Sequence, residues 1–322
     1  MNGHHNKNQL KNQAGTLSET DKGPGKPMRI GVFDSGIGGL SVLRYLLADC
    51  PHLEVVYLAD TAWMPYGDKP LDQIATRAAQ MLCWLADSQS LDSIVVACNT
   101  AASSLGLMDA ELCKLQGAPV SQHAARDKIL ATGVKLFEPI APTCHWLVKT
   151  VAPGTRVGLL ATQATFEAQR YTRMLSQLKA PFEAKSVGCP GLATLIEQDH
   201  MQSQHRAAFD AALTQFLKPL LDWPLEALVL GCTHYPIAAA QIATHLPEHV
   251  KLIDPAHSLR EAFLDACPLL PVKRNEQEEP PLNIWVTGSA EKFEERLQAM
   301  SIQRYLATRR VLKIAPVNID PA

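Results

Sequence analysis

Two stretches in the first half of this chain have counterparts in its second half. LDSIVVACNT at 91–100 matches LEALVLGCTH at 225–234, and RIGVFDSGIG at 29–38 parallels RVGLLATQAT at 156–165. A chain that repeats a strand pattern in this way is typical of two related structural units. Strands of parallel sheets also resemble one another because all are rich in Val, Ile and Leu. We nevertheless interpret the match as a duplication, since it extends to a cysteine.

That shared cysteine is Cys98 in the first half and Cys232 in the second, and each follows an apolar run. The chain has eight cysteines, and the other six lack both a matched partner and a neighbouring polar loop. We interpret those six as core or surface residues. The matched pair is the better candidate for chemistry.

Short apolar runs alternate with longer amphipathic stretches from Met28 onward. The predicted strands are 29–34, 53–60, 92–98, 133–138, 156–161, 182–189, 226–232, 251–256 and 282–288. The predicted helices are 40–47, 74–85, 165–178, 191–196, 206–221 and 291–300. This alternation is typical of βαβ units, and nine strands favour two sheets. We therefore predict an α/β fold with two pseudo-symmetric lobes, each a mainly parallel sheet flanked by helices, with the active site between the lobes.

A length of 322 residues is enough for two lobes. Residues 1–27 are polar throughout and predict a flexible N-terminal extension. We place a discontinuous first lobe at 28–125 plus 236–305, the second lobe at 126–235, and a C-terminal tail at 306–322.

The overall charge and the cysteine spacing exclude several classes of function. Thirty basic and thirty-two acidic side chains give a net charge of −2, so no general field attracts nucleic acid or an anionic membrane. No apolar run approaches the ~18 residues of a membrane span, and the first residues lack the apolar core of a secretory signal. The scattered cysteines show neither metal-ligand spacing nor a disulfide framework. We predict a cytoplasmic protein without a metal, nucleic-acid or membrane partner.

Polar residues collect where the predicted strands end, which is where open α/β sheets bind ligands. These segments are Asp34-Ser35, Asp60-Thr61, Cys98-Asn99-Thr100 and Cys232-Thr233-His234. The glycine-rich loop at 36–39 lacks the spacing of a nucleotide-binding motif. It is either a backbone site for a carboxylate or a plain tight turn.

The two matched cysteines are predicted to face each other across the cleft between the lobes. Backbone N–H groups in a strand-to-helix loop can lower a thiol pKa from about 8.5 toward neutrality. His234 can assist proton movement at Cys232, and Asp34 can do so on the other side.

Four motifs, FDSGIGGLSVL (33–43), ADTAWMPYGDK (59–69), VACNTAAS (96–103) and LGCTHYPI (230–237), occur in order. In this order they strongly resemble the glutamate racemase family, within the wider Asp/Glu racemase group, over about residues 29–300. Within them, Pro65-Tyr66-Gly67 separates glutamate racemases from more distant members.

The resemblance implies that Cys98 and Cys232 are the catalytic thiols of a cofactor-independent racemase and act from opposite faces of the substrate, with Asp34 and His234 assisting. It also implies a set of residues that hold L- or D-glutamate. These are Asp34, Ser35, Tyr66, Gly67, Asn99, Thr100, Thr165, Thr233 and His234, with Thr162 as a further carboxylate neighbour.

The implied role is supply of D-glutamate for peptidoglycan and thus for cell shape. Alternatives remain open: an aspartate racemase of the same family, or a racemase homologue that binds DNA gyrase. The resemblance also makes a UDP-muramyl-peptide effector and a second copy of this chain, in a homodimer, candidate partners. Residues 116–133 are longer than the usual crossover of the family, and the sequence assigns no role to them.

Overall fold

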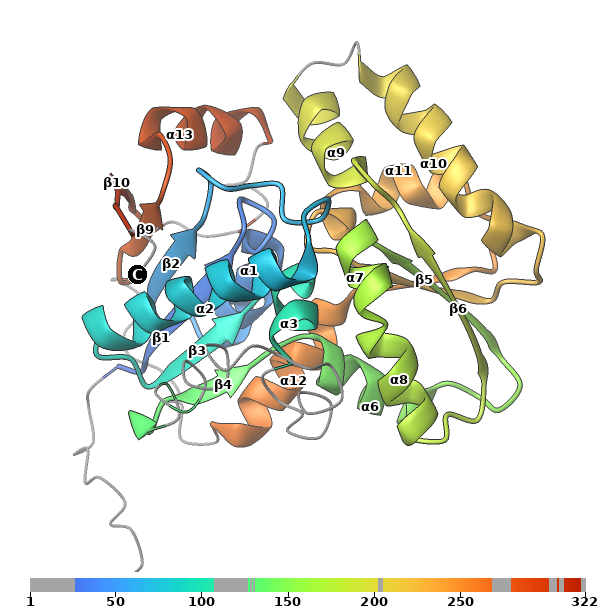
Figure 1. Ribbon diagram of the computed structural model, residues 1–322, viewed down its shortest axis with the longest axis horizontal. Helices are drawn as coiled ribbons and strands as arrows, with labels where there is room; N and C mark the ends of the chain where they lie inside the picture. Colours follow the sequence, from blue (N-terminus) through green and yellow to red (C-terminus); the bar gives the residue numbers. More distant parts are fainter. Residues whose placement is uncertain are drawn as a thin grey trace, which may run out of the picture.

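A computed structural model describes residues 27–106, 127, 129, 131–201, 205–267, 279–300, 306 and 310–319. The described chain forms two α/β lobes side by side, each built on its own parallel sheet (Figure 1). This confirms the predicted fold class. Within the described residues, no helix combines the length and the apolar character needed to cross a membrane.

The first lobe contains a six-stranded sheet in the order β10-β9-β2-β1-β3-β4, and all neighbouring strands are parallel. Its strands are β1 Arg29–Asp34, β2 Glu54–Ala59, β3 Ser93–Val96, β4 Lys135–Phe137, β9 Leu282–Val286 and β10 Leu312–Pro316. Its helices are α1 Leu40–Asp49, α2 Leu71–Ser88, α3 Asn99–Leu105, α12 Pro255–Ala266 and α13 Ala290–Ala299.

Alternating side chains of β1 enter two different cores of this lobe. Phe33 joins a cluster with α2 and α3, whereas Ile30 and Val32 join a cluster with α1, α12 and α13. This alternation follows from the two-residue period of a strand. Both faces of the sheet are therefore covered by helices, as a parallel sheet requires.

The second lobe contains a four-stranded parallel sheet in the order β6-β5-β7-β8. Its strands are β5 Arg156–Ala161, β6 Glu183–Gly188, β7 Ala227–Gly231 and β8 Lys251–Ile253. Its helices are α6 Ile140–Thr150, α7 Gln163–Ala168, α8 Arg170–Gln177, α9 Leu192–Met201, α10 Arg206–Leu221, the short 3₁₀ helix η2 Tyr235–Ala238, and α11 Ala239–Thr244.

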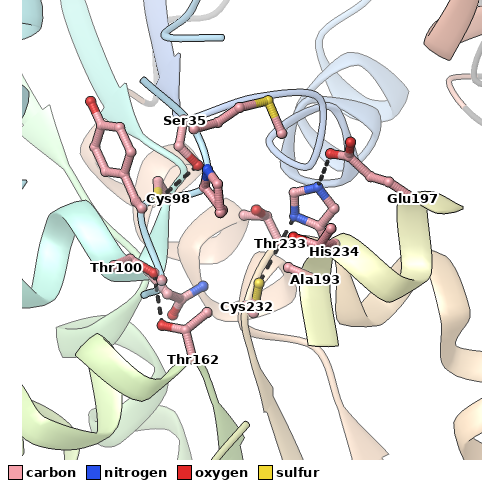
Figure 2. A pocket seen from close by; sticks show the side chains of 15 residues that line it. Ser35, Cys98, Thr100, Thr162, Ala193, Glu197, Cys232, Thr233 and His234 are labelled. Atoms are coloured by element: carbon pink, nitrogen blue, oxygen red, sulfur yellow. Dashed lines mark hydrogen bonds and ion pairs between the residues drawn. The ribbon is translucent and has the colours of Figure 1, made fainter. Parts of the chain in front are cut away.

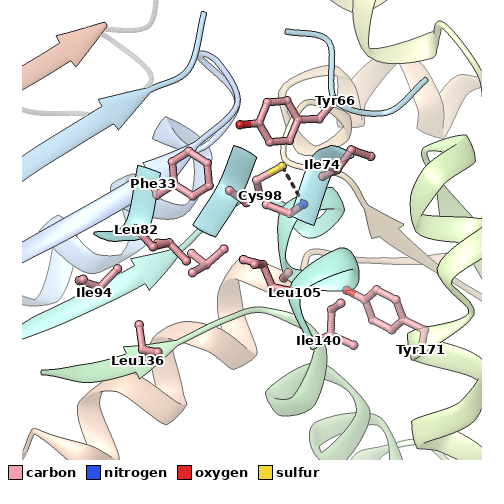
Figure 3. Packing of buried hydrophobic residues seen from close by; sticks show 14 of the residues in the cluster. Phe33, Tyr66, Ile74, Leu82, Ile94, Cys98, Leu105, Leu136, Ile140 and Tyr171 are labelled. Atoms are coloured by element: carbon pink, nitrogen blue, oxygen red, sulfur yellow. Dashed lines mark hydrogen bonds between the residues drawn. The ribbon is translucent and has the colours of Figure 1, made fainter. Parts of the chain in front are cut away.

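One hydrophobic core crosses the boundary between the lobes. It combines residues of α2, α3 and β3 with residues of α6, α8 and β5, among them Cys98, Ile140 and Tyr171 (Figure 3). Because this core is continuous, α3 packs against elements of both lobes. Cys98 precedes α3 and so lies at the junction.

The strand order bears out the duplication, since β2-β1-β3-β4 in one sheet matches β6-β5-β7-β8 in the other. The start of each repeat is held by an equivalent hydrogen bond. The backbone N–H of Arg29 donates to the Asp92 carboxylate at 2.8 Å, and that of Arg156 donates to the Glu226 carboxylate at 2.9 Å. Matched positions in the sequence thus make matched contacts.

The sheets depart from the predicted lobe boundaries at three strands. β4 falls within the predicted second lobe at 126–235 but pairs with β3 of the first sheet. β8 falls within the predicted first lobe at 236–305 but pairs with β7 of the second. β10 lies in the predicted C-terminal tail at 306–322 and is an edge strand beside β9. Backbone pairing decides these memberships, and short runs at sheet edges carry little periodicity to reveal it.

Several helices also differ from prediction. The predicted helix 165–178 is two helices, because Gln169 adopts a left-handed conformation with φ of 51° and ends α7. Helices α3, α6, α11 and α12 were not predicted. A signal for α12 was present, since Asp254 caps the first turn by accepting from Ala256 N at 2.9 Å and Pro255 follows it. The predicted extension to residue 26 and most of the 116–133 segment lie outside the described residues.

Candidate active site

Both matched cysteines line one pocket between the lobes (Figure 2). Cys98 follows β3 of the first sheet and Cys232 follows β7 of the second, so the two sulfurs come from opposite walls. The described residues that line the pocket are Ser35, Met64, Pro65, Tyr66, Gly67, Cys98, Asn99, Thr100, Thr162, Ala193, Thr194, Glu197, Cys232, Thr233 and His234. The structure thus brings most of the sequence-predicted site residues together.

Cys98 is the N-cap residue of α3. Its sulfur accepts a hydrogen bond from Ala101 N at 3.4 Å, and its S–H donates toward Ser35 Oγ at 3.7 Å. Burial, and after it the charge of Asp34, raise the pKa of the Cys98 thiol to about 12, and the two hydrogen bonds offset only part of this rise. The expectation of a lowered pKa is therefore wrong for Cys98, because so few donors cannot offset its desolvation. Cys98 is a thiol in this state.

Cys232 has a different environment, because a histidine lies beside its sulfur and a glutamate lies beside that histidine. His234 Nδ1 lies 4.0 Å from Cys232 Sγ, and His234 Nε2 lies 2.7 Å from Glu197 Oε1. Burial by itself lowers the pKa of His234, but hydrogen bonds and charges from Cys232 and Glu197 outweigh it and raise that pKa well above 6.5. His234 is therefore an imidazolium, the kind of cation found beside reactive cysteines.

Glu197 was missed by the sequence analysis. It lies on α9, one residue beyond the predicted helix 191–196, and its side chain is only 8% exposed. Burial raises the pKa of Glu197, but the hydrogen bond and charge of His234, together with the charge of Arg296, lower it overall. A carboxyl next to the apolar Ile196 was a weak signal of a buried acid, but nothing local pointed to His234 as its partner.

Asp34 does not line the pocket, although it was predicted to act there. It is fully buried, and its two oxygens accept from Gly36 N at 2.8 Å and from Thr233 Oγ1 at 3.1 Å. Burial raises the pKa of Asp34 despite the nearby charge of His234. Asp34 therefore connects the loop after β1 to the loop after β7, behind the pocket wall.

The loop at 36–39 also lies outside the pocket lining. Gly36 donates its N–H to Asp34, and the Gly36 carbonyl accepts from Tyr57 OH at 2.8 Å. Of the two readings of these glycines, the contacts favour the tight turn.

Thr162 lines the pocket, whereas Thr165 lies behind it. Thr162 caps α7, accepting from Thr165 N at 3.3 Å, and its hydroxyl lies 2.9 Å from the hydroxyls of Thr165 and of Thr100. Because Thr100 belongs to α3 and Thr162 precedes α7, this hydroxyl chain joins the two lobes at the pocket floor. Thr165 supports the wall from behind, since its hydroxyl also donates to that of Thr100 at 3.4 Å.

Two other predicted substrate-binding side chains are held by partners of their own. Tyr66 OH donates to Asp60 Oδ2 at 2.7 Å, and Asp60 is also paired with Arg77 at 2.7 Å. Asn99 Oδ1 accepts from Tyr171 OH at 2.7 Å. These bonds fix the ring of Tyr66 and the amide of Asn99 before any substrate arrives.

The pocket offers hydroxyl, amide and thiol groups to a ligand. Its described lining contains neither lysine nor arginine, so His234 is the cation among those residues. Nor do the described residues gather three His, Cys, Asp or Glu side chains in a way that can hold a metal ion. The arrangement suits proton transfer at a carbon held between two sulfurs.

Comparison with known proteins decides the family. The Asp/Glu/Hydantoin racemase family model matches residues 131–262. The glutamate racemase of Desulforudis audaxviator is 34% identical over 270 residues, which cover 82% of this chain and 90% of that protein. The chain belongs to the glutamate racemase family. The glutamate racemase of Prochlorococcus marinus strain NATL2A is 35% identical, over 74% of this chain and 81% of that protein.

Solved glutamate racemases share the fold. The Francisella tularensis enzyme, determined in complex with D-glutamate, is 27% identical with a TM-score of 0.72, covering 92% of this chain and 99% of that one. The Escherichia coli enzyme, determined with L-glutamate and the activator UDP-MurNAc-Ala, is 23% identical with a TM-score of 0.65, covering 91% and 99%. At that identity the second comparison shows the fold alone.

Within this racemase family member, Gly38 provides a test of how tightly the site is packed. A Cβ atom at Gly38 would lie 2.4 Å from Thr233 Oγ1 and 2.7 Å from His234 Nδ1. Both side chains are held by buried carboxylates and cannot move away without breaking those bonds. We expect Gly38→Ala to lower racemase kcat/KM by about 100-fold, the effect of misplacing catalytic groups by roughly 1 Å.

Gly154→Ala is the matched control for this substitution. Gly154 has φ of +79° in an exposed turn, and a Cβ there meets nothing within 4 Å. Alanine therefore strains the backbone at Gly154 and lowers stability, but it leaves racemase activity unchanged. Equal activity of the two variants would contradict the close packing of Gly38 against His234.

Proposed function

We propose that this protein interconverts L- and D-glutamate by a cofactor-independent two-base reaction in which Cys98 and Cys232 act on opposite faces of the α-carbon. The observation that carries the proposal is the placement of the two cysteines at equivalent strand ends of two duplicated lobes, on opposite walls of one pocket. Chemistry that inverts a carbon centre requires groups on both of its faces, and a duplicated fold supplies them.

The different environments of the two sulfurs support a starting state for the reaction. In the direction that starts from Cys98 as the thiol, Cys232, whose sulfur lies 4.0 Å from His234 Nδ1, is the sulfur that accepts the α-proton. In one direction the α-C–H bond breaks, its proton passes to the Cys232 sulfur, and the electron pair spreads into the α-carboxylate. The Cys98 S–H bond then breaks, and its proton forms the new C–H bond on the opposite face. The sulfurs have exchanged protonation states, as a racemase requires.

The weak acidity of the α-carbon means that the site must stabilise negative charge on the carboxylate. Fixed hydroxyl and amide donors do this better than water, because they need no reorientation as the charge develops. Ser35, Asn99 and Thr100 line the pocket and are the candidates for this role, whereas the Thr233 hydroxyl donates its hydrogen bond to Asp34. Asp34 assists from behind by holding Thr233, and His234 assists by its contact with Cys232.

Pyridoxal chemistry has no evident attachment point in this pocket. A pyridoxal cofactor forms its Schiff base with a lysine, and the described lining residues include none. We therefore propose proton transfer by the thiols alone.

To test the substrate, we would compare the rates at which the protein racemises L- and D-glutamate and L- and D-aspartate without added cofactor. Optical rotation measures these rates. Turnover of both glutamate enantiomers with little turnover of aspartate would support the proposal. The similar proteins, which are named glutamate racemases, already favour glutamate. Turnover of aspartate instead would favour the sister aspartate racemase.

We further propose that the D-glutamate serves peptidoglycan synthesis in the cytoplasm. The E. coli relative has an activator of the UDP-muramyl type, so an inactive preparation should be assayed again with a UDP-muramyl-peptide precursor. DNA gyrase binding and a homodimer remain predictions from the family resemblance. A protein that only binds gyrase would keep that binding when either cysteine is replaced.

A further inference from the structure

Helix α13 of the first lobe contacts helix α9 of the second at one end of the molecule (Figure 1). At this contact, Arg296 Nη1 on α13 lies 3.5 Å from Glu197 Oε2 on α9. The same nitrogen donates to Met64 Sδ at 3.0 Å. Because Met64 lines the pocket from the first lobe, Arg296 touches the pocket wall of one lobe and a buried acid of the other.

Glu197 uses its two oxygens for two different cations. Its Oε1 meets His234 Nε2 at 2.7 Å, and its Oε2 meets Arg296. A continuous series of contacts therefore runs from Arg296 through Glu197 and His234 to the Cys232 sulfur. Arg296 is 31% exposed, so its end of the series reaches solvent.

We propose that Arg296 is a positioning residue. It couples closure of the two lobes to the position of His234 beside the Cys232 sulfur, through the Glu197 carboxylate that holds His234. The proposal rests on the proposed racemase function. When the lobes are together, Arg296 contacts one oxygen of the Glu197 carboxylate and so helps to hold the other oxygen against His234. When they separate, the ion pair breaks, and Glu197 and His234 lose that restraint.

The charges around this series determine the expected effect on pH dependence. Two cations face Glu197, namely His234 in the loop after β7 and Arg296 on α13. His234 in turn also faces Cys232 and the charge of Asp34. Arg296 helps to keep the pKa of Glu197 low. Without this cation Glu197 takes up a proton at a higher pH, and protonated Glu197 no longer holds the imidazolium. The acidic limb of the rate profile must therefore move to higher pH.

Arg296→Met removes the charge while keeping much of the side-chain length. We expect kcat/KM for glutamate to fall by about three- to five-fold, the effect of losing a partly exposed ion pair, and the acidic limb of the pH profile to rise. Arg296→Lys should restore both, because a single nitrogen makes both contacts of Arg296. Lys292→Met removes a cation from the exposed side of the same helix and should change neither.

A double substitution separates this role from a merely structural one. In a Glu197→Gln background, Arg296→Met should have little further effect on kcat/KM, since the charged partner is already gone. An equal further loss in that background, or an unshifted pH profile in Arg296→Met alone, would overturn the inference.

A measurement without substrate distinguishes failure of this inference from failure of the proposed function. In the substrate-free protein, NMR titration of the His234 imidazole, assigned with a His234→Asn variant, should give a lower pKa in Arg296→Met than in wild type or Lys292→Met, because the Glu197 carboxylate that raises this pKa is no longer held against the ring. Wild type that does not racemise glutamate would refute the proposed function and leave this titration as the test of the coupling. An unchanged titration would overturn the coupling, whatever the substrate.

Discussion

Replacing either Cys98 or Cys232 with serine is expected to lower glutamate racemisation by about 10³-fold, within the range that a positioned acid or base contributes. Each enantiomer needs one sulfur to remove the α-proton and the other to return one, so either change stops both directions. A serine hydroxyl holds its proton too tightly to replace a thiol in this exchange. At Cys98 the change keeps the fold, because serine is a favoured N-cap residue for α3.

Solvent deuterium provides the readout that tests the two-base mechanism. In D₂O the wild-type product should carry deuterium at the α-position early in the reaction, while the remaining substrate keeps its hydrogen, because different sulfurs remove and supply the proton. Cys83→Ser, a half-buried cysteine on α2 outside the pocket lining, should behave as wild type. Racemisation that persists in either Cys98→Ser or Cys232→Ser would refute the assignment.

Replacing Arg170 with methionine is expected to destabilise the protein by about 3 kcal/mol, the lower end of the cost of breaking a buried ion pair. Arg170 begins α8 and is completely buried. Its guanidinium donates to Ala102 O on α3 at 2.8 Å and to Glu138 Oε1 at 3.1 Å. Removing the arginine leaves the Glu138 carboxylate, itself 2% exposed, without its countercharge.

The loss should be visible as a fall of roughly 6 °C in the thermal midpoint. Arg156→Met is the comparison, because its ion pair with Glu183 is 3.9 Å long and lies at the surface. Its loss costs at most about 1 kcal/mol. The Arg170→Met, Glu138→Gln double variant should recover part of the stability by removing the stranded charge. Equal midpoints for Arg170→Met and Arg156→Met would refute the role of the buried pair.

Glu138 places this ion pair at the point where the chain crosses between the lobes. It caps α6 by accepting from Ile140 N at 2.7 Å and Ala141 N at 3.0 Å, directly after β4, the strand from which the chain crosses into the second lobe. Arg170 therefore joins the crossing point, α8 and the helix that follows Cys98. Neither residue was a candidate from sequence, since a lone arginine in a helix is usually solvated.

The paired cysteines and the strands that carry them were predictable because both depend on local pattern. Apolar runs identify buried strands, and a ligand site lies beyond the carboxyl ends of parallel strands. Lobe membership was less predictable. The edge strands β4, β8 and β10 are three to five residues long and take their sheet from backbone pairing with distant residues. The left-handed Gln169, which splits the predicted helix 165–178, has no marker such as glycine or proline.

The sequence by itself determined the α/β class, the duplication and the two cysteines, since repetition and hydrophobic period are properties of neighbouring residues. Only the tertiary structure decided which groups surround each cysteine. Burial keeps Cys98 a thiol, and Glu197, 37 residues before its histidine partner, makes His234 a cation beside Cys232. A side chain's pKa depends on desolvation and on charges brought close by folding, and neither quantity is carried by the local sequence.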